Sequence, residues 1–139
     1  MKRRIFALAL ACLTLAALLS ACGETKEPDL RFTNNLDTEI HNVYLSPAEA
    51  EGWNDPVSVD KLGSGHTMSI DFSKAGEGAG PGLYDFGVID ENAMNYDLYE
   101  VTLAVGDKIE ISGNADGATY TVTHADGTQE TFDAWIYAN

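Results

Sequence analysis

The sequence predicts an all-β fold, a single antiparallel β-sandwich of about eight strands after a cleaved signal helix. After Pro28, short runs of alternating apolar and polar residues are separated by clusters of Gly, Asn and Asp. Alternation with a period of two indicates strands with one buried face, and strands at intervals of about 8–12 residues are typical of sandwiches and barrels. Residues 29–139 are therefore expected to form one domain with one core.

The expected strands make an immunoglobulin-like or similar arrangement. Tyr99, Val101, Leu103 and Val105 are expected to share one face of their strand, and residues 34–37 are expected to form a turn after the first strand. The sequence Ala125-Asp126-Gly127-Thr128 is a strong hairpin signal. The expected strands are 30–33, 40–45, 68–72, 84–88, 99–105, 109–111, 120–123 and 131–132.

One helical turn is expected after the second strand. Ser46 is a suitable N-cap, Pro47 suits the first helical position, and Glu49 completes a capping-box pattern. Gly52 would end the turn, and Trp53 is expected to fold back on the sandwich.

The first 21 residues have the three parts of a secretory signal peptide. Residues 2–4 are basic, residues 5–19 are almost wholly apolar, and the small residues Ser20 and Ala21 follow. The apolar run has 15 residues, whereas a membrane-spanning helix needs about 20. A cleaved leader is therefore expected over residues 1–21.

The four residues Leu19-Ser20-Ala21-Cys22 resemble the lipobox of bacterial lipoproteins. The resemblance implies that the Cys22 thiol takes a diacylglycerol, that the chain is cut just before it, and that palmitate-like acyl chains hold the protein to the membrane. Two or more acyl chains give stable anchoring. Residues 22–28 would be the lipidated N-terminus and a short tether, and the location would be the outward-facing membrane surface of the bacterial cell envelope.

The charge of the expected mature chain is strongly negative. Three of the eight Lys and Arg residues lie in the leader, which leaves five against 22 Asp and Glu, a net charge of −17. This balance argues against nucleic acid and against electrostatic adhesion to anionic lipid. The other cysteine, Cys12, lies in the leader, so we expect neither a disulfide nor a thiolate metal ligand in the mature domain.

A diffuse pattern over roughly residues 30–111 is similar to a small domain of exported bacterial proteins that have no assigned activity. The resemblance implies a fold and a location but no reaction. It departs at Asn54-Asp55-Pro56 and at residues 114–137, an extra hairpin. The pattern consists of Tyr44-Leu45-Ser46-Pro47, Trp53, Leu62, Gly63-Ser64-Gly65, Tyr84-Asp85 and Asp90-Glu91-Asn92.

No catalytic motif is evident, and we do not expect an enzyme. His41, His66 and His124 lie in neither a hydrolase nor a zinc-protease context, although Ser64 is close to His66. Chance pairs among 22 carboxylates leave a carboxylate hydrolase as an unlikely alternative.

Two binding alternatives stand beside an unassigned protein partner. Calcium is bound by several oxygen ligands, and the best-supplied loop contains Asp90, Glu91, Asn92, Asn95 and Asp97. The smaller clusters 114–117 and 126–127 are also rich in Asn, Asp and Gly, which favour turns for backbone reasons.

Aromatic rings are the other binding candidates. Trp53 and Trp135, with Tyr96 and Tyr137, could form a platform for a glycan, although Trp53 and at least one tyrosine are expected to belong to the core instead. The sequence therefore predicts a lipid-anchored, non-catalytic binding or interaction module, with a carbohydrate- or calcium-dependent ligand binder as the alternative. No cofactor other than calcium is expected.

Overall fold

The computed structural model describes residues 26–139, and Cys22 with the expected leader lies outside that range. Within it, no helix is long and apolar enough to span a bilayer. The elements are β1 (Leu30–Leu36), β2 (Ile40–Pro47), β3 (Thr67–Ile70), the 3-10 helix η1 (Phe72–Ala75), β4 (Gly82–Asp90), β5 (Met94–Leu103), β6 (Asp107–Asn114), β7 (Gly117–Thr123), β8 (Gln129–Asp133) and β9 (Trp135–Ala138).

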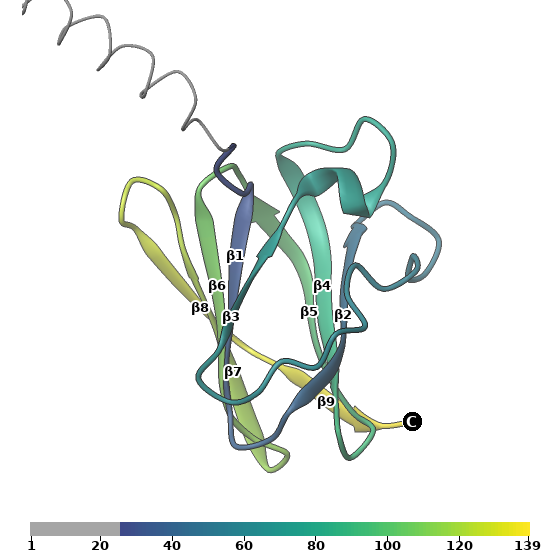
Figure 1. The fold of residues 1–139 in the computed structure, drawn as a ribbon. Helices are drawn as coiled ribbons and strands as arrows, with labels where there is room; N and C mark the ends of the chain where they lie inside the picture. The colour runs from purple at the N-terminus through teal and green to yellow at the C-terminus, as the bar shows by residue number, and fades with distance from the viewer. Residues whose placement is uncertain (1–25) are drawn as a thin grey trace, which may run out of the picture.

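The strands form two sheets that pack face to face (Figure 1). One sheet has the order β3-β1-β6-β7-β8, and the other has the order β2-β4-β5-β9. β1 and β6 run parallel, while the other paired strands run antiparallel. The prediction of an all-β sandwich is confirmed, with one parallel pair in an otherwise antiparallel structure.

The core lies between the sheets and follows the alternation of the strands. Phe86 of β4 connects the two sheets, because its ring centroid lies 5.0 Å from that of Phe32 and 5.8 Å from that of Tyr120. The Tyr120 hydroxyl donates to the backbone carbonyl of Tyr96 at 2.6 Å, so this buried polar group is satisfied. Each large apolar side chain buried in this way stabilises the fold by about 1.5–3 kcal/mol.

The chain covers the open edge of β2 after it leaves that strand. Residues 57–62 run beside β2, where backbone bridges join Val43 to Ser58 and Ile40 to Leu62. The chain then enters the other sheet as β3. An edge strand that is covered in this way is protected from pairing with another chain.

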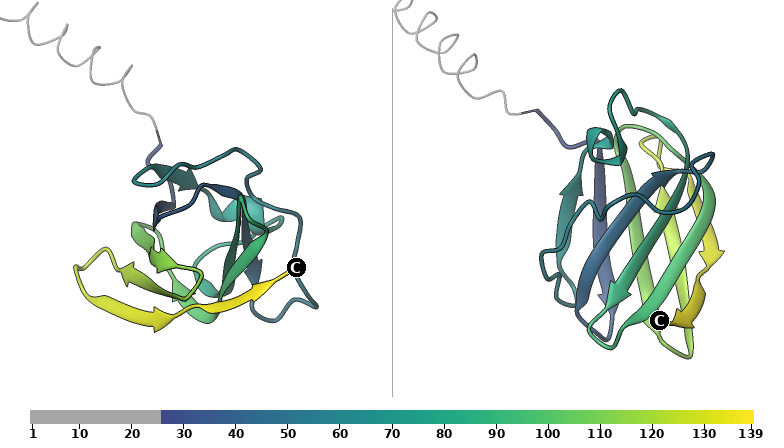
Figure 2. Two further views of the ribbon diagram at one scale, coloured as in Figure 1. Left: turned by 90° about the horizontal axis from the view of Figure 1, so that it is seen from below. Right: turned by 90° about the vertical axis from the view of Figure 1, so that its right-hand side faces the viewer.

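The two sheets are also connected at their opposite edges by the last strands. Ala134 alone separates β8 from β9, so the chain passes from the edge of one sheet to the edge of the other. Figure 2 shows this crossing in yellow. The Ala134 amide donates to the carbonyl of Ala118 at 3.0 Å. The crossing brings Trp135 and Tyr137 beside β5.

The predicted helical turn at Ser46 is wrong. β2 continues through Pro47 because its pairing with β4 extends that far, and a turn follows in which the Ala50 amide donates to the Pro47 carbonyl at 2.9 Å. The Ser46 hydroxyl accepts from the Asn54 amide at 2.9 Å instead of capping a helix. Strand pairing here outweighs the local capping pattern.

The predicted turn at residues 34–37 lies too early in the chain, because β1 runs to Leu36. Asn34 is fully buried. Its Nδ2 donates to the carbonyls of Thr38 and Leu62, each at 2.9 Å, and its Oδ1 accepts from the Leu36 amide at 3.0 Å. The side chain therefore satisfies buried backbone groups around the turn that follows.

A bulge in β5 changes which side chains face outward. Glu100 has a φ of 56°, and its amide donates to the Asp85 carboxylate at 2.9 Å. The bulge interrupts alternation, so Leu98 and Val101 are both buried while Tyr99 is exposed. The prediction that Tyr99 shares a face with Val101 is therefore wrong.

Candidate functional site

The outer face of the β2-β4-β5-β9 sheet carries a row of four paired positions. The register places Tyr44 opposite Gly87, Gly87 opposite Asp97, and Asp97 opposite Trp135. Side chains at paired positions lie on the same face of a sheet. Since the neighbours of these residues along β2 and β4 are buried in the core, the row faces away from the other sheet.

Trp53 lies over the centre of this row. Its ring centroid is 6.0 Å from that of Tyr44 and 6.0 Å from that of Tyr99. A Cβ atom at Gly87 would lie 3.1 Å from the indole, so the absence of a side chain there allows the close approach. Trp53 is 37% exposed, and the prediction that it folds back on the sandwich is confirmed.

The residue after Trp53 holds the loop in place. The Asn54 amide donates to the Ser46 hydroxyl at 2.9 Å, and Asn54 Nδ2 donates to the carbonyl of Ala75 at 2.9 Å. These two hydrogen bonds connect the loop to the end of β2 and to η1. The two hydrogen bonds of Asn54 therefore fix the loop, and with it the position of the Trp53 indole.

Asp97 is 3% exposed and lies beneath the rings. Its Oδ2 accepts from the hydroxyls of Tyr99 at 2.7 Å and Tyr137 at 2.6 Å. Its Oδ1 would lie 2.6 Å from a Cβ at Gly87 and accepts no hydrogen bond from another residue in the range 26–139. Within that range, none of the ion pairs involves Asp97.

The two tyrosine hydroxyls are fixed as donors to Asp97. Burial raises the pKa of Tyr99, and the hydrogen bond to Asp97 and the repulsion of its charge add to the shift. The hydrogen bond to Asp97 is the largest cause that raises the pKa of Tyr137, followed by burial. Both phenols therefore stay protonated at neutral pH and direct their protons at the carboxylate.

The rings and Asp97 border a hollow of about 280 Å³, which we name the aromatic groove. Its lining contains one acidic side chain, that of Asp97, and no Lys, Arg or His side chain. The lining residues are Tyr44, Trp53, Ile89, Asn95, Asp97, Tyr137 and Asn139.

Asp90, the first of the predicted calcium ligands, is engaged in the β4–β5 turn. Its Oδ1 accepts from the amides of Asn92 at 2.8 Å and Met94 at 3.0 Å. Its Oδ2 accepts from the hydroxyls of Thr38 at 3.0 Å and Tyr96 at 3.1 Å. The carboxylate thus has the partners that a buried charge requires.

The other predicted calcium ligands separate into two places. Glu91 accepts from the Glu39 amide at 3.1 Å, whereas Asn95 and Asp97 line the aromatic groove. Residues 26–139 contain no group of three or more His, Cys, Asp or Glu placed to hold a metal ion. Calcium binding stays a prediction. A hollow of about 270 Å³ beside Asp90 is lined by Asp37, Thr38, Asp90, Asn92, Tyr96, Asn114, Ala115 and Asp116.

The predicted aromatic platform is only partly assembled. Trp53 and Tyr137 line the groove, while Trp135 lies on the same face outside the lining and is 69% exposed. Tyr96 belongs to the core and is fully buried. Sequence reasoning did not assign Tyr44 to the site, because its outward position beside buried neighbours looks like an ordinary strand residue.

Of the three histidines, His124 has the most side-chain contacts, and both of them hold parts of the fold together. Its Nδ1 lies 2.9 Å from Asp107 Oδ2, and its Nε2 lies 2.8 Å from Glu130 Oε2. Hydrogen bonds first to Glu130 and then to Asp107 raise the pKa of His124. His41 lies 3.0 Å from Glu39, and His66 is exposed on the turn that contains Ser64.

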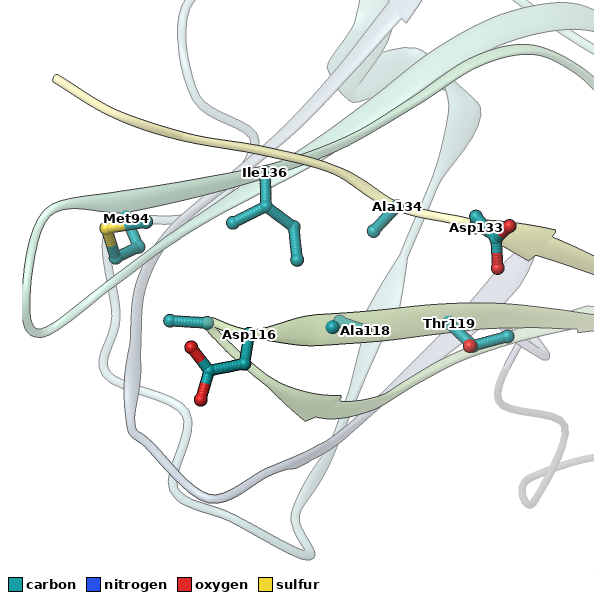
Figure 3. Close-up of a pocket in the computed structure, with 9 residues that line it drawn as sticks. Met94, Asp116, Ala118, Thr119, Asp133, Ala134 and Ile136 are labelled. Carbon is teal, nitrogen blue, oxygen red and sulfur yellow. The ribbon is translucent and has the colours of Figure 1, made fainter.

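A second, more open cleft lies where the chain crosses between the sheets. It has a volume of about 450 Å³. In Figure 3, Ile136 and Ala134 extend toward Ala118 on β7, while Asp116 and Asp133 lie on opposite sides of Ala118. The cleft has neither the clustered rings nor the buried carboxylate of the aromatic groove.

The fold and the groove define a class: a β-sandwich with an aromatic, acidic hollow on the outer face of one sheet. No known family model, curated protein or solved structure matches the chain. The diffuse resemblance over residues 30–111 therefore stays a prediction.

Proposed function

We propose that the chain is a lipid-anchored, exported β-sandwich of the bacterial cell envelope that acts as a non-catalytic binding module. Acylated Cys22 would be the membrane anchor, and the aromatic groove would be the ligand site. The observation that carries the proposal is the placement of Asp97 beneath exposed rings without a basic partner in the described chain.

This arrangement leaves one oxygen of Asp97 with bonding capacity that a ligand could use. A buried carboxylate is normally paired with a cation or saturated with hydrogen bonds. Asp90 shows the saturated case, with two donors on each oxygen. Asp97 has two donors on Oδ2 alone. Rings around a hollow with a few converging polar groups are typical of small-ligand sites.

The test is to map ligand contacts on isotope-labelled protein. Full-length protein would be mixed with small amines, oligosaccharides and peptides while backbone amide NMR signals are recorded. We expect shifts confined to the paired positions around Gly87 and Asp97 and to the loop that carries Trp53. Shifts confined to other faces, or no shift with any of the three classes, would contradict the groove as the ligand site.

Carbohydrate is a second candidate ligand, and the exposed indole of Trp135 favours it. Trp135 lies beside the groove on the same outer face, and sugars stack on such rings. Trp135→Leu should then weaken oligosaccharide binding together with Trp53→Leu. Oligosaccharide binding that needs neither indole would contradict this alternative.

A calcium-assisted partner is a further alternative. Asp37, Asp90 and Asp116 line one hollow together with two asparagines. No three acidic side chains among residues 26–139 are placed to hold a metal ion together, so a calcium ion there would need amide and backbone oxygens beside one or two carboxylates. Calcium should then raise the melting temperature, and Asp116→Asn should reduce the rise. No shift in wild-type protein would rule the site out.

A further inference from the structure

We propose that the ligand of the aromatic groove is a small organic cation, a methylated or quaternary ammonium group, held between the rings and facing Asp97. The inference rests on the proposed function and adds the chemical class of the ligand. Three rings line the hollow, from Tyr44, Trp53 and Tyr137, and Asp97 is its one acidic side chain.

The free oxygen of Asp97 gives the groove its charge preference. Oδ2 is occupied by two tyrosine hydroxyls, whereas Oδ1 has no hydrogen-bond donor within residues 26–139. No polar side-chain atom in that range is both fully buried and without a partner, so Oδ1 retains access to solvent, and Asp97 lines the hollow. A cation entering the hollow would pair with a carboxylate that has no basic neighbour in the lining.

The rings add attraction of the same sign. The face of an aromatic ring is negative, and a cation within about 6 Å of the ring centre is attracted to it, most strongly by indole. Trp53 is held close to Tyr44 by the loop contacts, at a centroid distance of 6.0 Å. Methyl groups on the cation would also cover apolar ring surface, which a bare metal ion cannot do.

The two phenol hydroxyls that bind Asp97 are not available as donors to a sugar. A sugar needs donors and acceptors directed at its hydroxyls. The hydroxyl of Tyr137 is directed at Asp97, and so is the hydroxyl of neighbouring Tyr99. The amides of Asn95 and Asn139 are the other side-chain donors in the lining apart from the indole N–H and the Tyr44 hydroxyl.

The charge of the whole chain acts in the same direction. The sequence carries 22 acidic and eight basic residues, so its long-range field attracts cations and raises their local concentration. No Lys, Arg or His lines the groove to oppose entry. The charge of the groove and the net charge of the chain therefore both favour a cationic ligand.

The test is calorimetric titration of the full-length protein in a polyoxyethylene detergent, which carries neither a sugar nor an ammonium group. The titrants are choline, tetramethylammonium, the neutral choline isostere 3,3-dimethylbutan-1-ol, and an oligosaccharide mixture. We expect saturable binding of the two cations, with the neutral isostere weaker by about tenfold or more. Phosphatidylcholine carried in the same detergent micelles would assign the cation to a lipid headgroup if it competes with choline, and to a soluble solute if it does not.

The variants separate a local effect from a change in overall charge. Asp97→Asn should weaken choline binding by about thirtyfold, and Trp53→Leu should weaken it by about tenfold. Asp133→Asn removes the same charge from an exposed position on β8 and should leave binding unchanged. Equal losses in Asp97→Asn and Asp133→Asn would overturn the inference.

Failure of the inference and failure of the proposed function give different results. Binding of oligosaccharide in the groove without binding of either cation would overturn the cation inference and leave the binding module standing. Absence of cation binding in a folded wild-type protein would likewise overturn the inference. Absence of every ligand class in the NMR mapping would overturn the proposed function as well.

Discussion

Asp90 and Asp97 are two buried carboxylates with different surroundings. Asp90 accepts four hydrogen bonds, two on each oxygen, and closes the turn between β4 and β5. Asp97 accepts two hydrogen bonds, both on Oδ2. The number of partners separates a carboxylate that organises its own fold from one that has bonding capacity left for a ligand.

Asp90→Ala should lower the free energy of unfolding by about 2–5 kcal/mol, because it leaves several donors without an acceptor, among them the buried hydroxyl of Tyr96. Chemical denaturation followed by circular dichroism measures the change. Asp60→Ala, at an exposed position, is the matched control and should change stability by less than about 0.5 kcal/mol. Equal effects of the two substitutions would show that the Asp90 contacts do not stabilise the turn.

At this scale the sequence indicated some site residues and not their grouping. Asp97 and Trp53 were both candidates, but for calcium and for a glycan respectively. Their meeting depends on Gly87, where a Cβ would lie 2.6 Å from Asp97 Oδ1 and 3.1 Å from the indole. A glycine inside a strand often marks a place where another group comes close to the backbone. Gly87 was therefore the feature of the sequence that could have indicated this contact.

The side chain of His124, at the start of the β7–β8 turn, contacts two carboxylates. One ring nitrogen contacts buried Asp107 and the other contacts exposed Glu130. Asp107 also accepts from the amides of Ala104 at 2.9 Å and Ala125 at 3.2 Å. The protonated imidazole, which donates from both nitrogens, therefore connects two neighbouring turns.

The stabilisation by His124 should depend on pH. Hydrogen bonds to Glu130 and Asp107 raise the folded-state pKa above the unfolded value of about 6.5. The stabilisation is therefore fully present below pH about 6.5 and is lost as the pH rises through the folded-state pKa. The difference in unfolding free energy between wild type and His124→Gln should shrink as the pH is raised. A difference that grows with pH, or His66→Gln with the same profile, would contradict this account.

At the level of elements, the strands were predictable and their interruptions were not. Alternation predicted eight of the strands, because most of them bury one face in the core. The capping pattern at Ser46 does not form a helix, because β2 pairs with β4 through Pro47. The bulge at Glu100 turns the Tyr99 side chain to the outer face of the sheet. Both outcomes depend on a neighbouring strand distant in sequence, which local pattern reading does not include.

The whole molecule combines an acidic domain with an expected lipid anchor. The predicted mature chain has five basic residues against 22 acidic ones, so anionic lipid would repel it. Attachment would then depend on the acyl chains of Cys22. The described domain begins close after this residue, which would hold the domain at the membrane surface facing outside the cytoplasm.

Cys22→Ser should release the protein from the membrane fraction, because serine has no thiol to acylate. Fractionation of cells followed by immunoblotting measures the release, and the intact mass of the wild-type protein should include a diacylglycerol. Ser20→Ala is the matched control and should remain in the membrane fraction. Membrane retention of Cys22→Ser, or a wild-type mass without lipid, would contradict the anchor.

The central claim is that the aromatic groove binds a ligand. The most direct test is to place a methyl group at Gly87, between Asp97 and the Trp53 indole. Trp53 and Trp135 are the two tryptophans of the chain, so Trp53 is the only fluorophore of its kind in a Trp135→Phe protein. Choline or an oligosaccharide should change Trp53 emission saturably in that protein. Adding Gly87→Ala should weaken the response by about tenfold or more while circular dichroism shows the same fold. An identical response with and without the alanine, or no saturable response to either ligand, would contradict the account.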